Sequence, residues 1–402
     1  MSRMNPDLDR LQPYPFEKLA LLKQGVTPPA GLEHISLGIG EPKHPAPPFV
    51  LDVLRENLDK VSVYPTTVGM LELRQSMADW CTRRFKLQDG SLSAERHMLP
   101  VNGTREAIFA FAQAAIQRSP DALLMLPDPF YQIYEGAAYL SGAEPYYLPC
   151  LPEHGFIPDY DAIPADIWKR TQLLFVCSPG NPTGAVHNME QLKKLIALAD
   201  EYDFIIASDE CYSELYFDEE KPPVGLLQAC AELGRHDYRN CVVFHSLSKR
   251  SNLPGLRSGF IAGDAELIEP FLLYRTYHGG AMQIQHQLAS IAAWNDEAHV
   301  LENRSQYRHK FDAAIKVLSP VLDVKTPDAS FYLWTPTPID DDQFTRGLFE
   351  QQNLTVLPGR YLSRPMADGR LPGAGFVRMA LVATVSEVIE AAERIRRYVE
   401  TL

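Results

Sequence analysis

Short apolar runs alternate with amphipathic segments through the middle of the chain. The four clearest apolar runs lie at 122–126, 173–177, 204–208 and 241–245. They are continuous rather than alternating, which is typical of strands buried on both faces. Between them, segments 105–117 and 189–202 repeat apolar residues at helical spacing. This alternation predicts an α/β fold with a mostly parallel central sheet and helices on both faces.

The pattern changes after about residue 265. The elements predicted there are a helix-rich stretch at 265–318, paired strands at 321–336, a strand at 375–381 and a helix at 386–402. Joined by the first forty-odd residues, this tail is expected to form a smaller α+β domain. We therefore place a large α/β domain at 46–290 and a small domain at 1–45 and 291–402.

Composition narrows the class of protein. The 402 residues are 46% hydrophobic and 22% charged, which excludes intrinsic disorder and predicts an ordinary soluble globular protein. The formal charge of −13 and the absence of a Lys/Arg tract argue against a nucleic-acid partner. No apolar stretch reaches eighteen residues and the N-terminus lacks an apolar core, so we expect neither a membrane span nor a signal peptide.

Cysteine and histidine usage points to the same class. The six cysteines form no C-x-x-C pair, and Cys177 and Cys241 lie in apolar runs, where a buried thiol is expected. A reducing, cytoplasmic location fits this pattern best. None of the eleven histidines belongs to a ligand-spaced cluster, so we predict no metal site.

Polar segments follow three of the predicted strands. SPGNPTG follows 173–177, DECY follows 204–208, and SLSKRSNLPGLRSG follows 241–245. Ligands of open parallel sheets bind beyond the carboxyl ends of the strands. One such segment would be an ordinary turn, but three at the same sheet edge predict a site.

The third segment resembles the lysine signature of the class I and II aminotransferases, which are fold-type I enzymes that use pyridoxal 5′-phosphate. Other matches, in the family's order, are Tyr64-x4-Gly69-x3-Leu73-Arg74, Asn181-Pro182-Thr183-Gly184 and Asp209-x-x-Tyr212. The resemblance covers nearly the whole chain. It implies the fold-type I fold, bound pyridoxal phosphate, and transfer of an amino group between an amino acid and a 2-oxo acid.

The resemblance also implies catalytic roles. Lys249 would bond covalently to the cofactor and then move a proton as general base and acid. Asp209 would hold the pyridine nitrogen protonated, and Tyr212 and Asn181 would hydrogen-bond the cofactor's O3′. Taken singly, these residues could be a solvated lysine, a helix N-cap and a buried tyrosine.

The cofactor's phosphate would lie at the start of the helix 105–117. Gly103, Thr104 and Arg105 open that helix, whose backbone N–H groups can hold an anion. The resemblance adds Ser246 and Arg257, which would close around the same phosphate.

Two aromatic residues complete the implied cofactor site. Tyr131 matches the ring that stacks on the pyridine, although a slip of one residue would exchange it with Phe130. Tyr64 matches a tyrosine that reaches the phosphate of the neighbouring subunit, which implies a homodimer with composite active sites.

The substrate's α-carboxylate would bind to the small domain. Arg378 matches the arginine that clamps this carboxylate through two parallel hydrogen bonds. Gly40 matches the glycine whose backbone approaches the same group, and Asn181 would also line this subsite. Substrate binding could then draw the small domain closed.

Competing interpretations are weaker or narrower. A nicotinamide-binding protein would need G-x-G-x-x-G after its first strand, which is missing. A non-enzymatic regulator with this fold would carry an additional DNA-binding domain before the motifs, and they begin by residue 38. A C–S lyase that uses the same cofactor remains an alternative, because the cofactor motifs are the same for transamination and for β-elimination.

Three short segments near the N-terminus indicate a narrower group of aminotransferases. Segments 10–19, 37–47 and 64–69 resemble bacterial N-succinyl-L,L-diaminopimelate aminotransferases of lysine biosynthesis. An aspartate- or alanine-type aminotransferase is the alternative. A long donor ending in carboxylates needs further cationic or hydroxyl groups, and Arg360, Arg364 and Arg370 are the arginines considered for that role.

Overall fold

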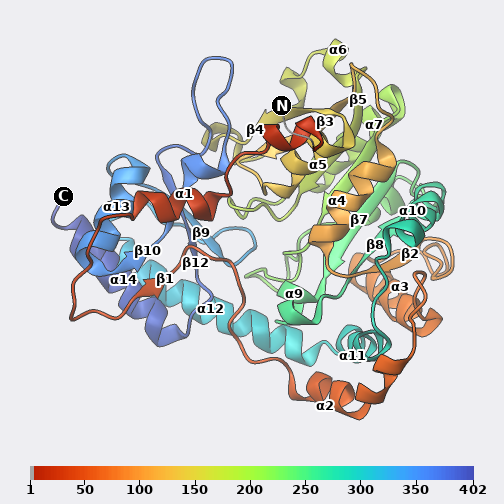
Figure 1. Ribbon diagram of the computed structural model, residues 1–402, viewed down its shortest axis with the longest axis horizontal. Coiled ribbons are helices and arrows are strands. Elements are labelled where there is room, and N and C mark those ends of the chain that lie inside the picture. Colours follow the sequence, from red (N-terminus) through yellow and green to blue (C-terminus); the bar gives the residue numbers. More distant parts are fainter. Residues whose placement is uncertain (1–3) are drawn as a thin grey trace.

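The computed structural model describes residues 4–402 and centres on a seven-stranded sheet (Figure 1). In spatial order its strands are β2 (Met98–Val101), β8 (Gly259–Gly263), β7 (Cys241–Ser246), β6 (Ile205–Asp209), β5 (Thr171–Cys177), β3 (Leu123–Asp128) and β4 (Glu144–Pro149). Strands β7, β6, β5, β3 and β4 are parallel, and β8 runs antiparallel to both of its neighbours. The predicted mostly parallel α/β sheet is confirmed.

Both faces of this sheet are covered by helices. One face packs against α3 (Leu71–Phe85), α7 (Met189–Tyr202), α8 (Leu226–Glu232) and α11 (Ile284–Asn295). The other packs against α4 (Thr104–Ala115), α5 (Ile133–Ser141) and α10 (Ala265–His278). Within β5, Leu174 and Val176 enter the first core while Leu173 and Phe175 enter the second. This explains why its sequence is a continuous apolar run.

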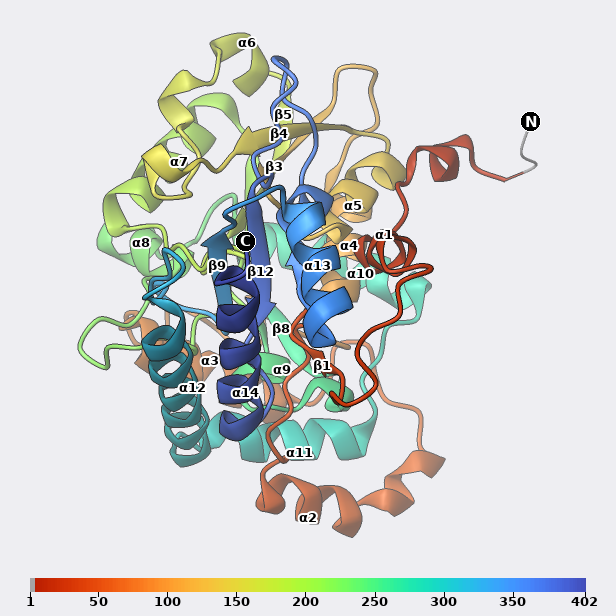
Figure 2. The ribbon, with the colours of Figure 1, turned by 90° about the vertical axis from the view of Figure 1, so that its left-hand side faces the viewer.

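A smaller unit is built from the end of the chain (Figure 2). Its antiparallel sheet has the order β11 (Leu357–Pro358), β12 (Phe376–Ala380), β9 (Tyr332–Pro336), and a parallel pair joins β1 (Ile35–Ser36) to β10 (Leu354–Thr355). The helices packed here are α12 (Ala298–Leu318), α13 (Asp341–Gln352) and α14 (Val385–Val399). A Thr384–Glu387 capping box fixes the start of α14.

The paired strands predicted at 321–336 are wrong in part. Only Tyr332–Pro336 forms a strand, and it pairs with β12 rather than with the preceding residues. Leu322 and Val324 are buried against the small-unit core in irregular chain, and Ala329 makes a single bridge to Tyr216. Long-range pairing with β12 therefore replaced the local hairpin.

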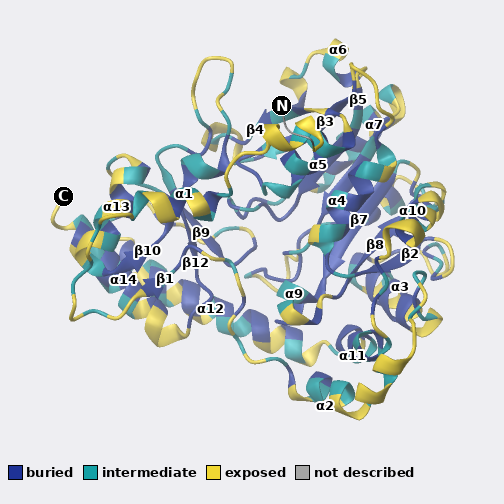
Figure 3. Ribbon diagram, in the orientation of Figure 1, coloured by how far each residue is buried: buried dark blue, intermediate teal, exposed yellow. Residues whose placement is uncertain are grey.

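The remaining helices are short. They are α1 (Pro15–Leu22), α2 (Pro48–Glu56), α6 (Ala165–Trp168), α9 (Leu247–Arg250) and the 3₁₀ turns η1 (Pro6–Arg10), η2 (Leu58–Ser62), η3 (Pro152–His154), η4 (Tyr160–Ala162), η5 (Pro254–Leu256) and η6 (Gly359–Leu362). Figure 3 shows that exposed positions gather on the outer helices and loops, while the central strands are buried. Within residues 4–402, no helix combines the length and hydropathy needed to cross a membrane.

The division into domains at 46–290 stays a proposal. The boundary after residue 290 would cut α11, whose Trp294 packs 4.9 Å from Trp80 of α3, centroid to centroid. We would therefore end the large domain after α11.

Candidate active site

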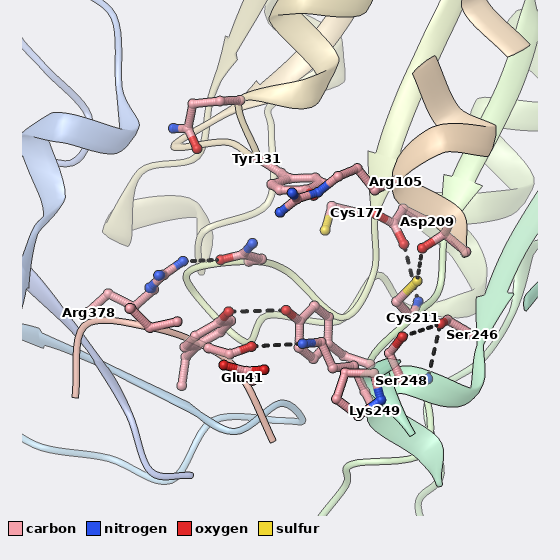
Figure 4. Close-up of a pocket in the computed structure, with 18 of the residues that line it drawn as sticks. Glu41, Arg105, Tyr131, Cys177, Asp209, Cys211, Ser246, Ser248, Lys249 and Arg378 are labelled. Atoms are coloured by element: carbon pink, nitrogen blue, oxygen red, sulfur yellow. Dashed lines mark hydrogen bonds between the residues drawn. The ribbon is translucent and has the colours of Figure 1, made fainter. Parts of the chain in front are cut away.

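A cavity of about 430 Å³ opens where the carboxyl ends of β5, β6 and β7 face the smaller unit (Figure 4). All of the predicted site residues line it except Gly103 and Tyr64. The sheet topology explains this convergence, because the three strands are adjacent and parallel.

Lys249 lies in α9, directly after β7. Its Nζ donates a hydrogen bond of 2.7 Å to the carbonyl oxygen of Gly40 and lies 5.0 Å from the ring centroid of Phe331. Burial lowers the pKa of Lys249 to about 8, and the positive charges of Arg378 and Arg105 act in the same direction. A lowered pKa makes the neutral, nucleophilic amine accessible near neutral pH.

Asp209 is the last residue of β6 and is buried. Its Oδ2 accepts a 2.7 Å hydrogen bond from the Tyr134 hydroxyl, and its Oδ1 accepts one of 3.3 Å from the Cys211 backbone N–H. Burial raises the pKa of Asp209. Tyr134 was not predicted from the sequence, although it lies only three residues after Tyr131, in the first turn of α5.

Tyr212 and Asn181 each contact the opposite wall. The Tyr212 hydroxyl lies 3.2 Å from that of Tyr332, and Asn181 Oδ1 accepts a 3.0 Å hydrogen bond from Arg378 Nη1. Tyr332, in β9, also lines the pocket and was not predicted, because no local signal in the sequence connects it to the motifs.

One end of the pocket is rich in N–H and O–H groups. Ser246 Oγ lies 2.9 Å from Ser248 Oγ and accepts a 3.1 Å hydrogen bond from the Ser248 N–H. Gly103 has φ of +87°, and a Cβ there would lie 2.0 Å from the guanidinium of Arg257. Only glycine therefore lets Arg257 approach the start of α4, where Thr104 also lines the cavity. Ser248 was not predicted.

Arg378 forms the other end. It lies in β12, is 5% exposed, and its Nη2 donates a 2.9 Å hydrogen bond to the Gly38 carbonyl. Its guanidinium carbon lies 4.3 Å from the centroid of the Tyr332 ring. The buried Nε has no hydrogen-bond partner among residues 4–402, so this arginine keeps donor capacity. A Cβ on Gly40 would lie 1.9 Å from the Tyr332 hydroxyl, so a larger residue here would force one of the two to shift.

Tyr131 lines the pocket, while Phe130 is 1% exposed and packs 5.6 Å from Tyr147, centroid to centroid. This arrangement agrees with the sequence match that assigned Tyr131, rather than Phe130, to the cofactor ring. Arg105 Nε donates a 2.5 Å hydrogen bond to the Tyr131 hydroxyl, and its side chain lies along the ring (Figure 4).

Four residues considered at the sequence level lie elsewhere. Tyr64 is 99% exposed and does not reach this chain's own pocket. The three arginines considered for the donor's distal arm pair with carboxylates away from the cavity, which corrects that hypothesis. Their partners are Asp340 and Asp341 for Arg360, Glu135 for Arg364, and Asp368 for Arg370.

Comparison with known proteins gives a consistent result. The model of the family described as aminotransferase class I and II matches residues 33–395. The chain is 33% identical to the LL-diaminopimelate aminotransferase of Syntrophobacter fumaroxidans over 97% of each protein, and 33% identical to that of Aquifex aeolicus over 98% of this chain and 99% of the relative.

Solved structures agree on the fold. A Neisseria meningitidis aminotransferase superimposes with a TM-score of 0.93 at 50% identity, covering 98% of this chain and 99% of the other. A probable N-succinyldiaminopimelate aminotransferase from Thermus thermophilus gives a TM-score of 0.84 at 26% identity, covering 96% of this chain and all of the other.

Proposed function

This chain belongs to the class I and II aminotransferases, and we propose that it transfers the amino group of N-succinyl-L,L-diaminopimelate to 2-oxoglutarate in lysine biosynthesis. The family depends on pyridoxal phosphate and acts on amino and 2-oxo acids. The observation that carries the narrower proposal is a further cation in the pocket, besides Lys249, Arg257 and Arg378. Within the described chain, Arg105 lines the cavity without a carboxylate partner, so it could bind a donor's distal carboxylate.

The pocket fits pyridoxal phosphate on chemical grounds. Gly103 leaves a cradle in which Arg257, Thr104, Ser246 and Ser248 offer donors for a phosphate. The remaining contacts would be Asp209 on the ring nitrogen, Tyr131 against the ring face, Tyr212 and Asn181 on the ring oxygen, and Lys249 as the covalent attachment point. When bound, the cofactor supplies an aldehyde that accepts the amino group and a ring that withdraws electrons.

The chain's own residues would then divide the work. Arg378 and Asn181 would orient the donor's α-carboxylate, so that its Cα–H points toward Lys249. The Lys249 amine, neutral in a good fraction of molecules near its pKa of about 8, would remove and return that proton. Asp209 would supply a fixed negative charge in a buried position, held by the Tyr134 hydroxyl.

L,L-Diaminopimelate itself is the second candidate donor. The curated relatives carry that name, and it has the same carbon skeleton as the succinylated compound. Glu41 also lines the cavity, and its carboxylate could pair with the free distal ammonium that succinylation removes. Arg105 and Glu41 therefore favour different donors.

The test is kcat/KM for both compounds, aspartate, alanine and N-acetylornithine, with 2-oxoglutarate as acceptor and glutamate as the product measured. We expect the succinylated donor to be preferred. If aspartate or alanine is preferred by tenfold, about 1.4 kcal/mol of transition-state discrimination, the narrower assignment fails. With a sulfur amino acid as donor, release of a thiol, ammonia and a 2-oxo acid without glutamate would instead identify elimination.

A further inference from the structure

A continuous chain of hydrogen bonds links α12 to the backbone of the proposed catalytic lysine. Lys310 Nζ lies 2.6 Å from His44 Nε2, and His44 Nδ1 lies 2.7 Å from Asn303 Oδ1. Asn303 Nδ2 then donates to the carbonyl oxygens of Lys249 at 3.1 Å and Arg250 at 3.3 Å. Lys310, His44 and Asn303 are not among the residues that line the pocket on which the proposed function is based.

The direction of every bond in this chain is determined. Carbonyl oxygens only accept, so the Asn303 amide nitrogen must face Lys249 and its oxygen must face His44. His44 Nδ1 therefore carries the proton that it donates to Asn303. His44 Nε2 is then the acceptor for the Lys310 amine, and only one tautomer of neutral histidine satisfies both neighbours.

The chain is also buried. Asn303 is 5% exposed and Lys310 is 1% exposed, and within residues 4–402 no carboxylate forms an ion pair with Lys310. Among the residues that the structure describes, its amine has one further acceptor besides His44, the Val382 carbonyl at 3.2 Å. Burying a lysine without a carboxylate is costly, so simple packing is a poor explanation for its place here.

Segment 40–44 holds Lys249 in two ways, directly through its side chain and indirectly through Asn303. Helix α9 has four residues, too few to satisfy its own last carbonyls, and Asn303 bonds two of them. His44, which holds Asn303, lies four residues after Gly40, whose carbonyl accepts the Lys249 Nζ (Figure 4). Asn252 Nδ2 also donates to the His44 carbonyl. The segment 40–44 thus contacts both the side chain of Lys249 and, through Asn303, its backbone.

We propose that Asn303, oriented by His44 and Lys310, is a positioning residue that holds the backbone of Lys249 while its amine leaves and returns to the reacting centre. The Nζ–Gly40 bond must break whenever the amine engages cofactor or substrate. The Asn303 bonds do not involve Nζ, so they persist and keep the amine's point of attachment fixed. The inference rests on the proposed role of Lys249, but not on which donor the enzyme uses.

The experiment compares four variants of the full-length holoenzyme. Asn303→Leu keeps the volume and removes the donor, and His44→Phe removes the orienting imidazole. His44→Gln is the conservative rescue, because its amide can donate to Asn303 and accept from Lys310. His34→Phe is the matched control, since His34 contacts Thr355 and takes no part in this chain.

We expect Asn303→Leu and His44→Phe to lower kcat roughly tenfold or more while KM changes less than about twofold, because misplacing a reacting group costs rate rather than carboxylate binding. Hydrogen exchange of the amides at 249–253 should accelerate in both variants. His44→Gln should recover most of the rate, and His34→Phe should behave as wild type.

Three results would overturn the proposal. They are an Asn303→Leu protein with normal kcat and normal exchange, a His44→Gln protein as slow as His44→Phe, or a loss confined to KM. If Asn303→Leu fails to fold, the His44 pair decides alone. Hydrogen exchange needs no turnover, so it tests the Asn303 bonds even if the proposed reaction is wrong. The role of Lys249 in that reaction is tested separately by Lys249→Ala.

Discussion

The two walls of the pocket are built in different ways. On one wall, Asp209 and Ser246 end adjacent parallel strands, and Tyr212 and Lys249 each follow three residues later. The opposite wall is assembled from Gly40 before α2, Tyr332 in β9 and Arg378 in β12, which are far apart in the sequence. The first wall is therefore set by strand ends, and the second by tertiary contacts.

Three hydrogen bonds join the walls, and they explain why the difference matters. They connect Lys249 to Gly40, Tyr212 to Tyr332, and Asn181 to Arg378. Each uses an atom that the bound cofactor or substrate would be expected to engage. The strand-end wall should thus stay fixed on binding, while the assembled wall exchanges partners and moves.

Removing the amine from the fixed wall should have the largest effect. Lys249→Ala is expected to lower the rate of amino transfer at least about a thousandfold, because no other group replaces the general base. In the wild type, borohydride should trap the cofactor on Lys249, as detected by peptide mass spectrometry. Transfer at the wild-type rate in Lys249→Ala would refute the assignment.

The next largest effect should come from the assembled wall. Arg378→Lys keeps the charge but loses the planar fork, so kcat/KM should fall roughly a hundredfold, mainly through KM. Steady-state kinetics with the best donor gives both parameters. Arg370→Lys, on an exposed arginine paired with Asp368, is the control and should leave them unchanged.

A smaller effect is expected where the assembled wall approaches most closely. Gly40→Ala places a Cβ 1.9 Å from the Tyr332 hydroxyl, so one of the two must move, and kcat/KM should fall about tenfold. Gly31→Ala meets nothing within 4 Å and serves as control. Adding Tyr332→Phe should recover part of the loss. If Gly40→Ala is as active as Gly31→Ala, the close approach has no functional consequence.

The pH dependence of cofactor capture tests the fixed wall without turnover. With a pKa of about 8 for Lys249, the neutral amine is half populated near pH 8 and falls on acidification. The rate of covalent capture of pyridoxal phosphate should therefore be about fivefold lower at pH 7 than at pH 8. This rate should level off above pH 9. Stopped-flow absorbance measures this rate, and a midpoint above pH 10 would contradict a perturbed lysine.

The smallest effect is expected from a third region, the exposed Tyr64. If the active unit is a homodimer with composite sites, Tyr64→Phe should weaken cofactor retention severalfold, through loss of one hydrogen bond to the partner's phosphate. Dialysis followed by cofactor absorbance measures retention, and size-exclusion chromatography measures the assembly. A fully active monomer would exclude the composite site.

The accuracy of sequence prediction follows the same division. The strands β3, β5, β6 and β7 and the residues after them were predicted because buried runs and motifs are local signals. Tyr332 and Tyr134 were missed, because they reach the site only through β9 pairing and α5 packing. The hairpin at 321–336 was wrong for the same reason, since β9 pairs with the distant strand β12, from Tyr332 opposite Ala380 to Pro336 opposite Phe376.

By itself, the sequence determined the α/β class, the order of the motifs and the wall that carries Lys249 and Asp209. Periodicity and residue spacing act over a few residues, and adjacent parallel strands bring such motifs together automatically. Only the tertiary structure decided that Tyr131 rather than Phe130 lines the cavity, and that Arg364 is paired elsewhere with Glu135. Which side chain meets which across the pocket depends on packing over the whole chain, and no local pattern contains that information.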